Sequence, residues 1–168
     1  VFYQFKEIGL QQTSSATHKV TDSAASGTAL ASGTLTYNGA VGVDTALNSL
    51  TNIAEIVADM GWSTGVVATS TISHATPASF YAHVISRGME ETIVSQLLDS
   101  EIDFFAGGGQ DKFIRRSDSI DLLPIAAEKG FIIDTSGLAA PESLKADQKY
   151  GFLNASGVMP KTTKSRGD

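Results

Sequence analysis

Residues Leu50 to Thr69 read LTNIAEIVADMGWSTGVVAT, a helix pattern followed at once by a strand pattern. Apolar side chains recur at helical spacing in the first part, at Leu50, Ile53, Ala54, Val57 and Met60, and Gly61 is a natural end for that helix. The run at 63–69 is short, apolar and β-branched, which predicts a buried strand. A helix that leads directly into a buried strand is the repeating unit of α/β proteins.

The same alternation continues along the chain. A second helix is expected around Ile93, Val94, Leu97 and Leu98, and IDFFAGGG at 102–109 is expected to be a strand that ends in a glycine turn. A helix from Leu122 to Gly130, a strand from Phe131 and a last strand from Tyr150 complete the pattern. Near-continuous apolar strands that alternate with helices predict an α/β three-layer sandwich, with a mostly parallel central sheet and helices on both faces. Because no linker or repeat divides the chain, residues 1–168 are predicted to be a segment of a single domain.

Composition narrows the function classes. The 12 basic and 18 acidic residues leave a formal net charge of −6, which argues against a nucleic-acid-binding groove. The chain has no Cys, which excludes thiolate catalysis, cysteine zinc sites and disulfides. No apolar run approaches the roughly 18 residues of a membrane span. A small anionic substrate is still compatible with this composition, because local charges or metal ions can override the net sign.

VTDSAASGTALASG, from Val20 to Gly33, places an acid and a hydroxyl before a run of small residues. Asp22 is a good N-cap for a helix from Ser23 to Ser32, and Gly27 would let that helix pack closely against the sheet. The positive end of the helix would then lie beside the Ser23 hydroxyl and suit a phosphate group. The same pattern is also typical of an ordinary capped helix, so it does not establish catalysis.

A nucleophilic serine needs an activating group, and the sequence leaves that group open. None of the three histidines, His18, His74 and His83, forms a His-x-x-x-His pair, and Ser23 lacks the GxSxG elbow of serine hydrolases. Either His74 or His83 acts as a base from elsewhere in the fold, or a metal ion activates the hydroxyl.

Several blocks of the chain, in order, resemble the alkaline phosphatases. VTDSAASGT (Val20 to Thr28) resembles their active-site signature, and the similarity continues through LTYNGAVGVD (35–44), SHATPASFYAHVISRG (73–88) and DFFAGGG (103–109). The blocks are most similar to the cold-active bacterial enzymes. The resemblance implies a hydrolase that cleaves small phosphate monoesters at alkaline pH through a covalent phosphoserine intermediate, with zinc and magnesium as cofactors.

The resemblance also implies roles for five residues. Ser23 would attack phosphorus and bind zinc, and Asp22 would help to hold Arg87, which would bind the phosphate oxygens bidentately. Thr76 would be a magnesium ligand, and His74 would lie near that metal without binding it directly.

Three further interpretations accompany these roles. Thr76, which precedes Pro77, also has the pattern of a helix N-cap. His83 is expected to be a packed structural histidine. Gly107 to Gly109 could be a phosphate cradle from its composition, whereas the resemblance implies a structural turn.

Most metal ligands of the family have no counterpart in these residues. The aspartate-x-x-x-histidine and aspartate-histidine pairs that bind zinc, and the glutamate that binds magnesium, are missing from the chain. We therefore expect an internal fragment, with the N- and C-terminal parts of the full domain missing, that by itself binds zinc poorly and hydrolyses little. The full enzyme is expected to be a homodimer that is periplasmic or secreted. Two alternatives stay open: a non-catalytic phosphate-binding or interaction domain, and a metal-free serine hydrolase.

Overall fold

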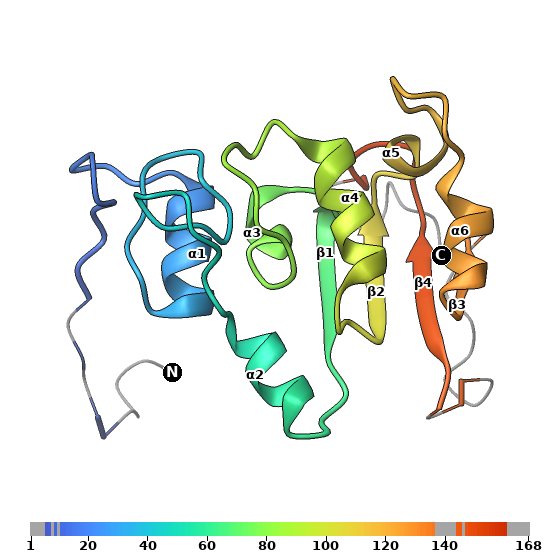
Figure 1. Cartoon of the computed structure of the whole chain (residues 1–168), viewed down its shortest axis with the longest axis horizontal. Helices are drawn as coiled ribbons and strands as arrows, with labels where there is room; N and C mark the ends of the chain where they lie inside the picture. Colours follow the sequence, from blue (N-terminus) through green and yellow to red (C-terminus); the bar gives the residue numbers. More distant parts are fainter. Residues whose placement is uncertain (1–5, 8, 10, 137–143, 146, 161–168) are drawn as a thin grey trace.

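A computed structural model describes residues 6–7, 9, 11–136, 144–145 and 147–160. In it, four strands form one parallel sheet in the order β1-β2-β4-β3 (Figure 1). Their bounds are Gly65–Thr71 for β1, Phe104–Gly108 for β2, Phe131–Asp134 for β3 and Lys149–Leu153 for β4. The α/β class and the parallel sheet predicted from the sequence are thus confirmed.

Six helices accompany these strands among the described residues. They are α1 (Ser23–Ser32), α2 (Ile53–Asp59), α3 (Ala75–Ala78), α4 (Glu90–Asp99), α5 (Asp111–Ile114) and α6 (Leu122–Glu128). Local signals set several ends: Asn52 and Glu55 form a capping box at the start of α2, and Asp121 caps α6. Gly61 and Gly130 follow α2 and α6 with positive φ angles of 81° and 86°. No described helix is both long and apolar enough to cross a membrane.

The main core lies on the face of the sheet that α4, α5 and α6 cover (Figure 1). Phe105 of β2 is fully buried there, and its ring contacts those of Phe113 and Phe131 at centroid distances of 6.0 and 5.5 Å. Gly151 lies opposite Phe105 in the parallel register, and a Cβ at that position would overlap the Phe105 ring. The small residue in β4 therefore makes room for the large one in β2.

Side chains that point to the opposite face form a smaller cluster. Ala106, Tyr150 and Phe152 are buried in it, and Phe104 packs against them together with Leu144. At the sheet margins, Val67 of β1 and Ile132 of β3 stay 72% and 51% exposed. No residue of a described helix belongs to this cluster, so the described chain shows only one of the two helical layers that the sequence predicts.

α1 lies beyond the open edge of β1, where it packs against α3 (Figure 1). The closest approach is at Gly27, where a Cβ would lie 2.7 Å from the Ser79 hydroxyl oxygen. Gly27 therefore allows a close contact, as predicted, but the prediction that its partner is the sheet is wrong. Residues 73–74, which follow the carboxyl end of β1, lead directly into α3, so α1, α3 and the end of β1 meet at one place.

Candidate functional site

Ser23 is the first residue of α1, immediately after its N-cap. Asp22 has extended backbone angles (φ −96°, ψ 176°), and its carboxylate Oδ1 accepts a hydrogen bond of 2.9 Å from the Ala25 amide. This confirms the predicted cap, which satisfies one of the free amides of the first turn. Ser23 is half-buried, so its hydroxyl stands at the positive end of a ten-residue helix.

Arg87 brings the predicted site residues together. Its Nη1 donates to the Ser23 Oγ at 2.6 Å and also lies 3.3 Å from the Asp22 Oδ2. Its Nη2 lies 3.0 Å from the His74 Nε2. Because a guanidinium can only donate, the His74 Nε2 accepts this bond and the ring proton resides on Nδ1. Residues from two separate parts of the sequence, 22–23 and His74, thus converge on the Arg87 guanidinium.

The pKa of Asp22 lies below its usual value. Partial burial by itself would raise the pKa, but hydrogen bonds from the Ala25 amide, the Gly39 amide, the Arg87 side chain and the Ala24 amide together outweigh that effect. Asp22 is therefore a carboxylate at neutral pH and carries the charge that pairs with Arg87.

The two candidate bases, His74 and His83, have ring contacts with groups other than the Ser23 hydroxyl. The His74 ring contacts Arg87, not Ser23. The His83 ring lies 2.8 Å from both the Gly42 carbonyl and the Glu55 Oε1, and its main-chain amide donates to Gln96. His83 is therefore a packed structural histidine, as predicted. Within the described part of the chain, no histidine contacts the Ser23 hydroxyl.

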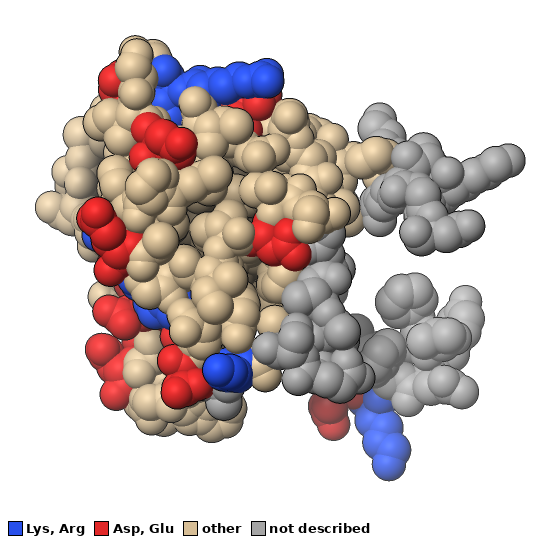
Figure 2. All heavy atoms as spheres, turned by 90° about the vertical axis from the view of Figure 1, so that its right-hand side faces the viewer, with Lys and Arg blue, Asp and Glu red and all other residues tan. Residues whose placement is uncertain are grey.

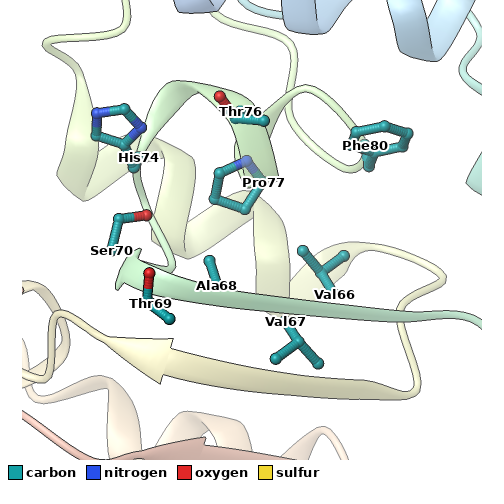
Figure 3. Close-up of a pocket in the computed structure, with 9 residues that line it drawn as sticks. All are labelled: Val66, Val67, Ala68, Thr69, Ser70, His74, Thr76, Pro77 and Phe80. Carbon is teal, nitrogen blue, oxygen red and sulfur yellow. The ribbon is translucent and has the colours of Figure 1, made fainter. Parts of the chain in front are cut away.

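Thr76 lies on α3 beside a cavity of about 360 Å³ between that helix and the edge of β1 (Figure 3). Ser70 and His74 also line this cavity, and Figure 3 shows His74 and Thr76 on the same side of it. The prediction that Thr76 is a helix N-cap is wrong, because α3 begins at Ala75 with His74 in the cap position. Pro77 falls within the first turn, where its missing N–H removes no helical bond, so the helix can begin before it.

The described residues do not complete a metal site. The lining of this cavity includes hydroxyl groups and one imidazole but no carboxylate. A protein magnesium site usually includes at least one carboxylate, and a zinc site about four N, O or S ligands. No group of three or more His, Asp or Glu side chains in the described ranges is placed to hold a metal ion.

Gly107 to Gly109 form no open loop at this site. Gly107 and Gly108 belong to β2, and the Gly109 amide donates to the carbonyls of Ala155 and Gly157. A Cβ at Gly108 would overlap the Gly157 carbonyl, so the glycines serve close packing of two chain segments. The prediction of a structural turn is therefore wrong for Gly107 and Gly108, which extend the strand, and only Gly109, with a φ of 97°, lies after it.

Asn38 belongs to the site although nothing in its local sequence marks it. Its side chain forms hydrogen bonds to the main chain on both sides of Thr21. Oδ1 accepts from the Asp22 amide at 3.2 Å, and Nδ2 donates to the Val20 carbonyl at 3.1 Å. The one available signal was its place inside LTYNGAVGVD, a block that resembles the family but carries no obvious chemistry.

Comparison with known sequences points to one family. The alkaline phosphatase family model matches residues 1–130. Alkaline phosphatase 4 of Bacillus subtilis is 44% identical over 105 residues, which are 59% of this chain and 23% of that protein. The alkaline phosphatase of Escherichia fergusonii is 33% identical over an alignment of 183 residues, with 94% of this chain and 39% of that protein covered.

Solved structures give the same result. The alkaline phosphatase from the Antarctic bacterium TAB5 superposes with a TM-score of 0.92 and 49% identity, over 99% of this chain and 48% of that chain. A histidine-to-aspartate mutant of the TAB5 enzyme, with Mg bound in its M3 site, superposes with a TM-score of 0.94 and 47% identity. The chain spans about half of these structures and less than half of the curated relatives named above.

Proposed function

Because the chain belongs to the alkaline phosphatase family, we propose that its Ser23 site serves the hydrolysis of small phosphate monoesters. The observation that carries the proposal is the convergence of the Ser23 hydroxyl and the Asp22 carboxylate on the Arg87 guanidinium. A guanidinium fork can hold two oxygens of a phosphoryl group, and the first turn of α1 adds positive potential beside it.

In the proposed reaction the Ser23 oxygen attacks phosphorus. A bond from phosphorus to Oγ forms as the bond to the ester oxygen breaks, and the alcohol leaves with a proton. Water then attacks the phosphoseryl group, which releases inorganic phosphate and restores the hydroxyl. Nη1 of Arg87 already donates to this oxygen and would stabilise negative charge on it, while the Asp22 carboxylate and the His74 ring orient the guanidinium.

Zinc and magnesium are proposed as cofactors on the family resemblance and on the magnesium-bound TAB5 structure. When bound, such ions would lower the pKa of a hydroxyl or water and neutralise phosphoryl charge. Of the described residues, only Ser23 and Thr76 are proposed as ligands, and they do not complete either site. A metal-assisted reaction therefore requires ligands beyond the residues described. The homodimer and the periplasmic or secreted location stay predictions.

The proposal is tested by phosphorylation of Ser23 and by turnover. The chain would be incubated with p-nitrophenyl phosphate, zinc and magnesium, quenched in acid and examined by mass spectrometry. We expect phosphate on the peptide that contains Ser23, at a turnover that is low for this chain and absent in Ser23→Ala. Ser26→Ala is the matched control, because Ser26 is an exposed hydroxyl on the same helix. Phosphate on another residue, or unchanged turnover in Ser23→Ala, would contradict the proposal.

A non-catalytic phosphate-binding domain is the second candidate. It needs only the Arg87 guanidinium and the first turn of α1, and no group of three or more His, Asp or Glu side chains among the described residues is placed to hold a metal ion. Phosphate affinity that is unchanged by a chelator, without phosphorylation of Ser23, would support it. The metal-free serine hydrolase is disfavoured, because the rings of His74 and His83 bond to Arg87, Gly42 and Glu55 rather than to Ser23.

A further inference from the structure

The segment from Tyr37 to Val41 lies between the start of α1 and Arg87, and it bonds to both. Towards α1, the Asn38 side chain uses both ends of its amide: Oδ1 accepts from the Asp22 amide and Nδ2 donates to the Val20 carbonyl. The Gly39 amide faces the Asp22 carboxylate and contributes to the lowering of its pKa. The main chain that enters the first turn of α1 is therefore held on two sides.

Towards Arg87, the same segment makes a second set of bonds. The Arg87 amide donates to the Gly39 carbonyl at 2.7 Å, and the Tyr37 hydroxyl donates to the Ile85 carbonyl at 2.8 Å. Val41 and Val84 exchange two main-chain bonds of 3.0 and 2.8 Å as an antiparallel bridge. Gly39 has a φ of 94°, a conformation that L side chains rarely adopt. A glycine at this turn lets one residue face both Asp22 and Arg87.

We propose that Asn38 is a positioning residue for phosphate binding, a role that rests on the proposed function of the site. It fixes the main chain of Asp22, and the Asp22 carboxylate in turn holds Nη1 of Arg87 against the Ser23 oxygen. Bidentate phosphate recognition depends on the direction of the guanidinium fork, so a small displacement of its anchor costs affinity. The hydrogen bonds of the Asn38 side chain go to the Asp22 amide and the Val20 carbonyl rather than to Ser23 or Arg87, so it acts through Asp22.

The chemistry of the side chain explains why an amide is needed there. An asparagine can accept from the Asp22 amide and donate to the Val20 carbonyl at once, whereas an aspartate can only accept. Asn38→Asp would keep the size of the side chain but lose the second bond, and it would place a second carboxylate near Asp22. Asn38→Ala would lose both bonds.

The experiment measures the affinity of the chain for inorganic phosphate by calorimetry, in the presence of a chelator. We expect Asn38→Ala and Asn38→Asp each to weaken binding about tenfold or more, while Asn48→Ala stays within twofold of wild type. Asn48 is a matched control because it is an exposed loop asparagine whose side chain bonds only to Asp44. Two variants are used because Asn38→Asp preserves side-chain volume even if Asn38→Ala fails to fold. Unchanged affinity in Asn38→Asp overturns the proposal.

A double-mutant comparison separates positioning from general destabilisation. In an Arg87→Ala background, Asn38→Ala should change the remaining phosphate affinity by less than twofold, because the group that Asn38 positions is gone. A tenfold loss that persists in that background would show that Asn38 acts by another route, and it would overturn the proposal.

Failure of the proposed function can be told apart from failure of this inference. If wild-type chain binds no phosphate, the phosphate site itself is wrong. Hydrogen exchange then tests the role of Asn38 independently of phosphate. The Ala25 amide, which bonds to the Asp22 carboxylate, and the Arg87 amide, which bonds to the Gly39 carbonyl, should exchange at least tenfold faster in Asn38→Asp than in wild type. Unchanged exchange at both amides overturns the positioning role, and Asn48→Ala again serves as the control.

Discussion

Arg87 makes three side-chain contacts that together define the site: with Ser23, Asp22 and His74. The first two partners lie 64 and 65 positions away in the sequence. The structure thus brings together four of the five residues that the family resemblance singles out, with Thr76 on the cavity that His74 also lines, while their catalytic roles stay predictions. His74 is placed against Arg87, so its clearest contribution in this structure is to orient the guanidinium.

The His74→Asp variant should bind magnesium more tightly than wild type. The cavity beside Thr76 contains hydroxyl groups but no carboxylate, and magnesium prefers carboxylate oxygen to imidazole nitrogen. Titration of the chain with magnesium should show an affinity about tenfold higher in His74→Asp. His83→Asp, in which the histidine lies outside the cavity, should show no gain. A gain in both variants would mean that added charge alone draws the ion.

The Asp22→Asn variant should lose part of the acid sensitivity of folding. Because the pKa of Asp22 is lowered in the folded state, the charged carboxylate stabilises the fold above the unfolded-state pKa of about 3.9. That contribution is lost as pH falls through the folded-state pKa.

Denaturant unfolding at pH 7 and pH 3 should show a smaller difference in the free energy of unfolding for Asp22→Asn than for wild type. At pH 7 the substitution should cost no more than about 1 kcal/mol, because asparagine also caps helices and the ion pair is partly exposed. An equal or larger pH difference in Asp22→Asn would contradict the prediction.

The ends of several helices in this chain are set by residues close in sequence, whereas the elements against which a helix packs are not. Asp22, Asn52 and Asp121 cap α1, α2 and α6 through bonds to amides two or three residues ahead. The position of α1 depends instead on α3, which carries no strong helix pattern and has only four residues. Contact between the two helices is closest where Gly27 meets Ser79.

The Gly27→Ala variant tests this contact. In a helix without neighbours the change would stabilise by about 1 kcal/mol, because alanine is the better helix former. Here the new methyl group would lie 2.7 Å from the Ser79 oxygen, which is itself bonded to the Ala75 carbonyl, so a net loss of about 1 kcal/mol or more is expected. Denaturant unfolding should show that loss, and Ser79→Ala in the same chain should relieve part of it. A stabilised Gly27→Ala protein would mean that α1 can shift away from α3 at little cost.

The molecule as a whole concentrates its packing on one face of the sheet. Phe105, Phe113 and Phe131 are buried between the strands and the helices α4 to α6, whereas Val67 and Ile132 on the other face are mostly exposed. Figure 2 shows an outer surface where acidic side chains are scattered among uncharged ones, in keeping with the net charge of −6.

Truncation of apolar strand residues should therefore have very different effects on the two faces. Phe105→Ala should lower the free energy of unfolding by about 3–5 kcal/mol, since it leaves a cavity in the main core. Ile132→Ala, on the edge strand β3 and facing away from α4 to α6, should cost less than about 1 kcal/mol. Chemical denaturation of both variants gives the comparison. Similar losses at the two positions would mean that the second face is covered in solution.

Most of the fold follows from local sequence. Alternating helix and strand patterns indicated α1, α2, α4, α6 and all four strands, and apolar strands without polar alternation indicated a parallel sheet. The family blocks indicated Ser23, Asp22, Arg87, Thr76 and His74. Local patterns failed at α3, where a threonine before a proline favoured the wrong cap.

The sequence by itself determined that helices and strands alternate and that capping residues start α1, α2 and α6, because those properties depend on neighbours within a few residues. It did not determine burial in every strand: the run at 63–69 predicts a buried strand, but no residue of β1 is buried and Val67 is 72% exposed. Only the tertiary structure decided that α1 packs on α3, that His74 accepts from Arg87, and that Asn38 bonds to the main chain around Thr21. These contacts join residues 13 to 52 positions apart, from His74 and Arg87 to Gly27 and Ser79. Neither helical nor strand periodicity contains information about such pairings, which are set by the way packed elements meet in space.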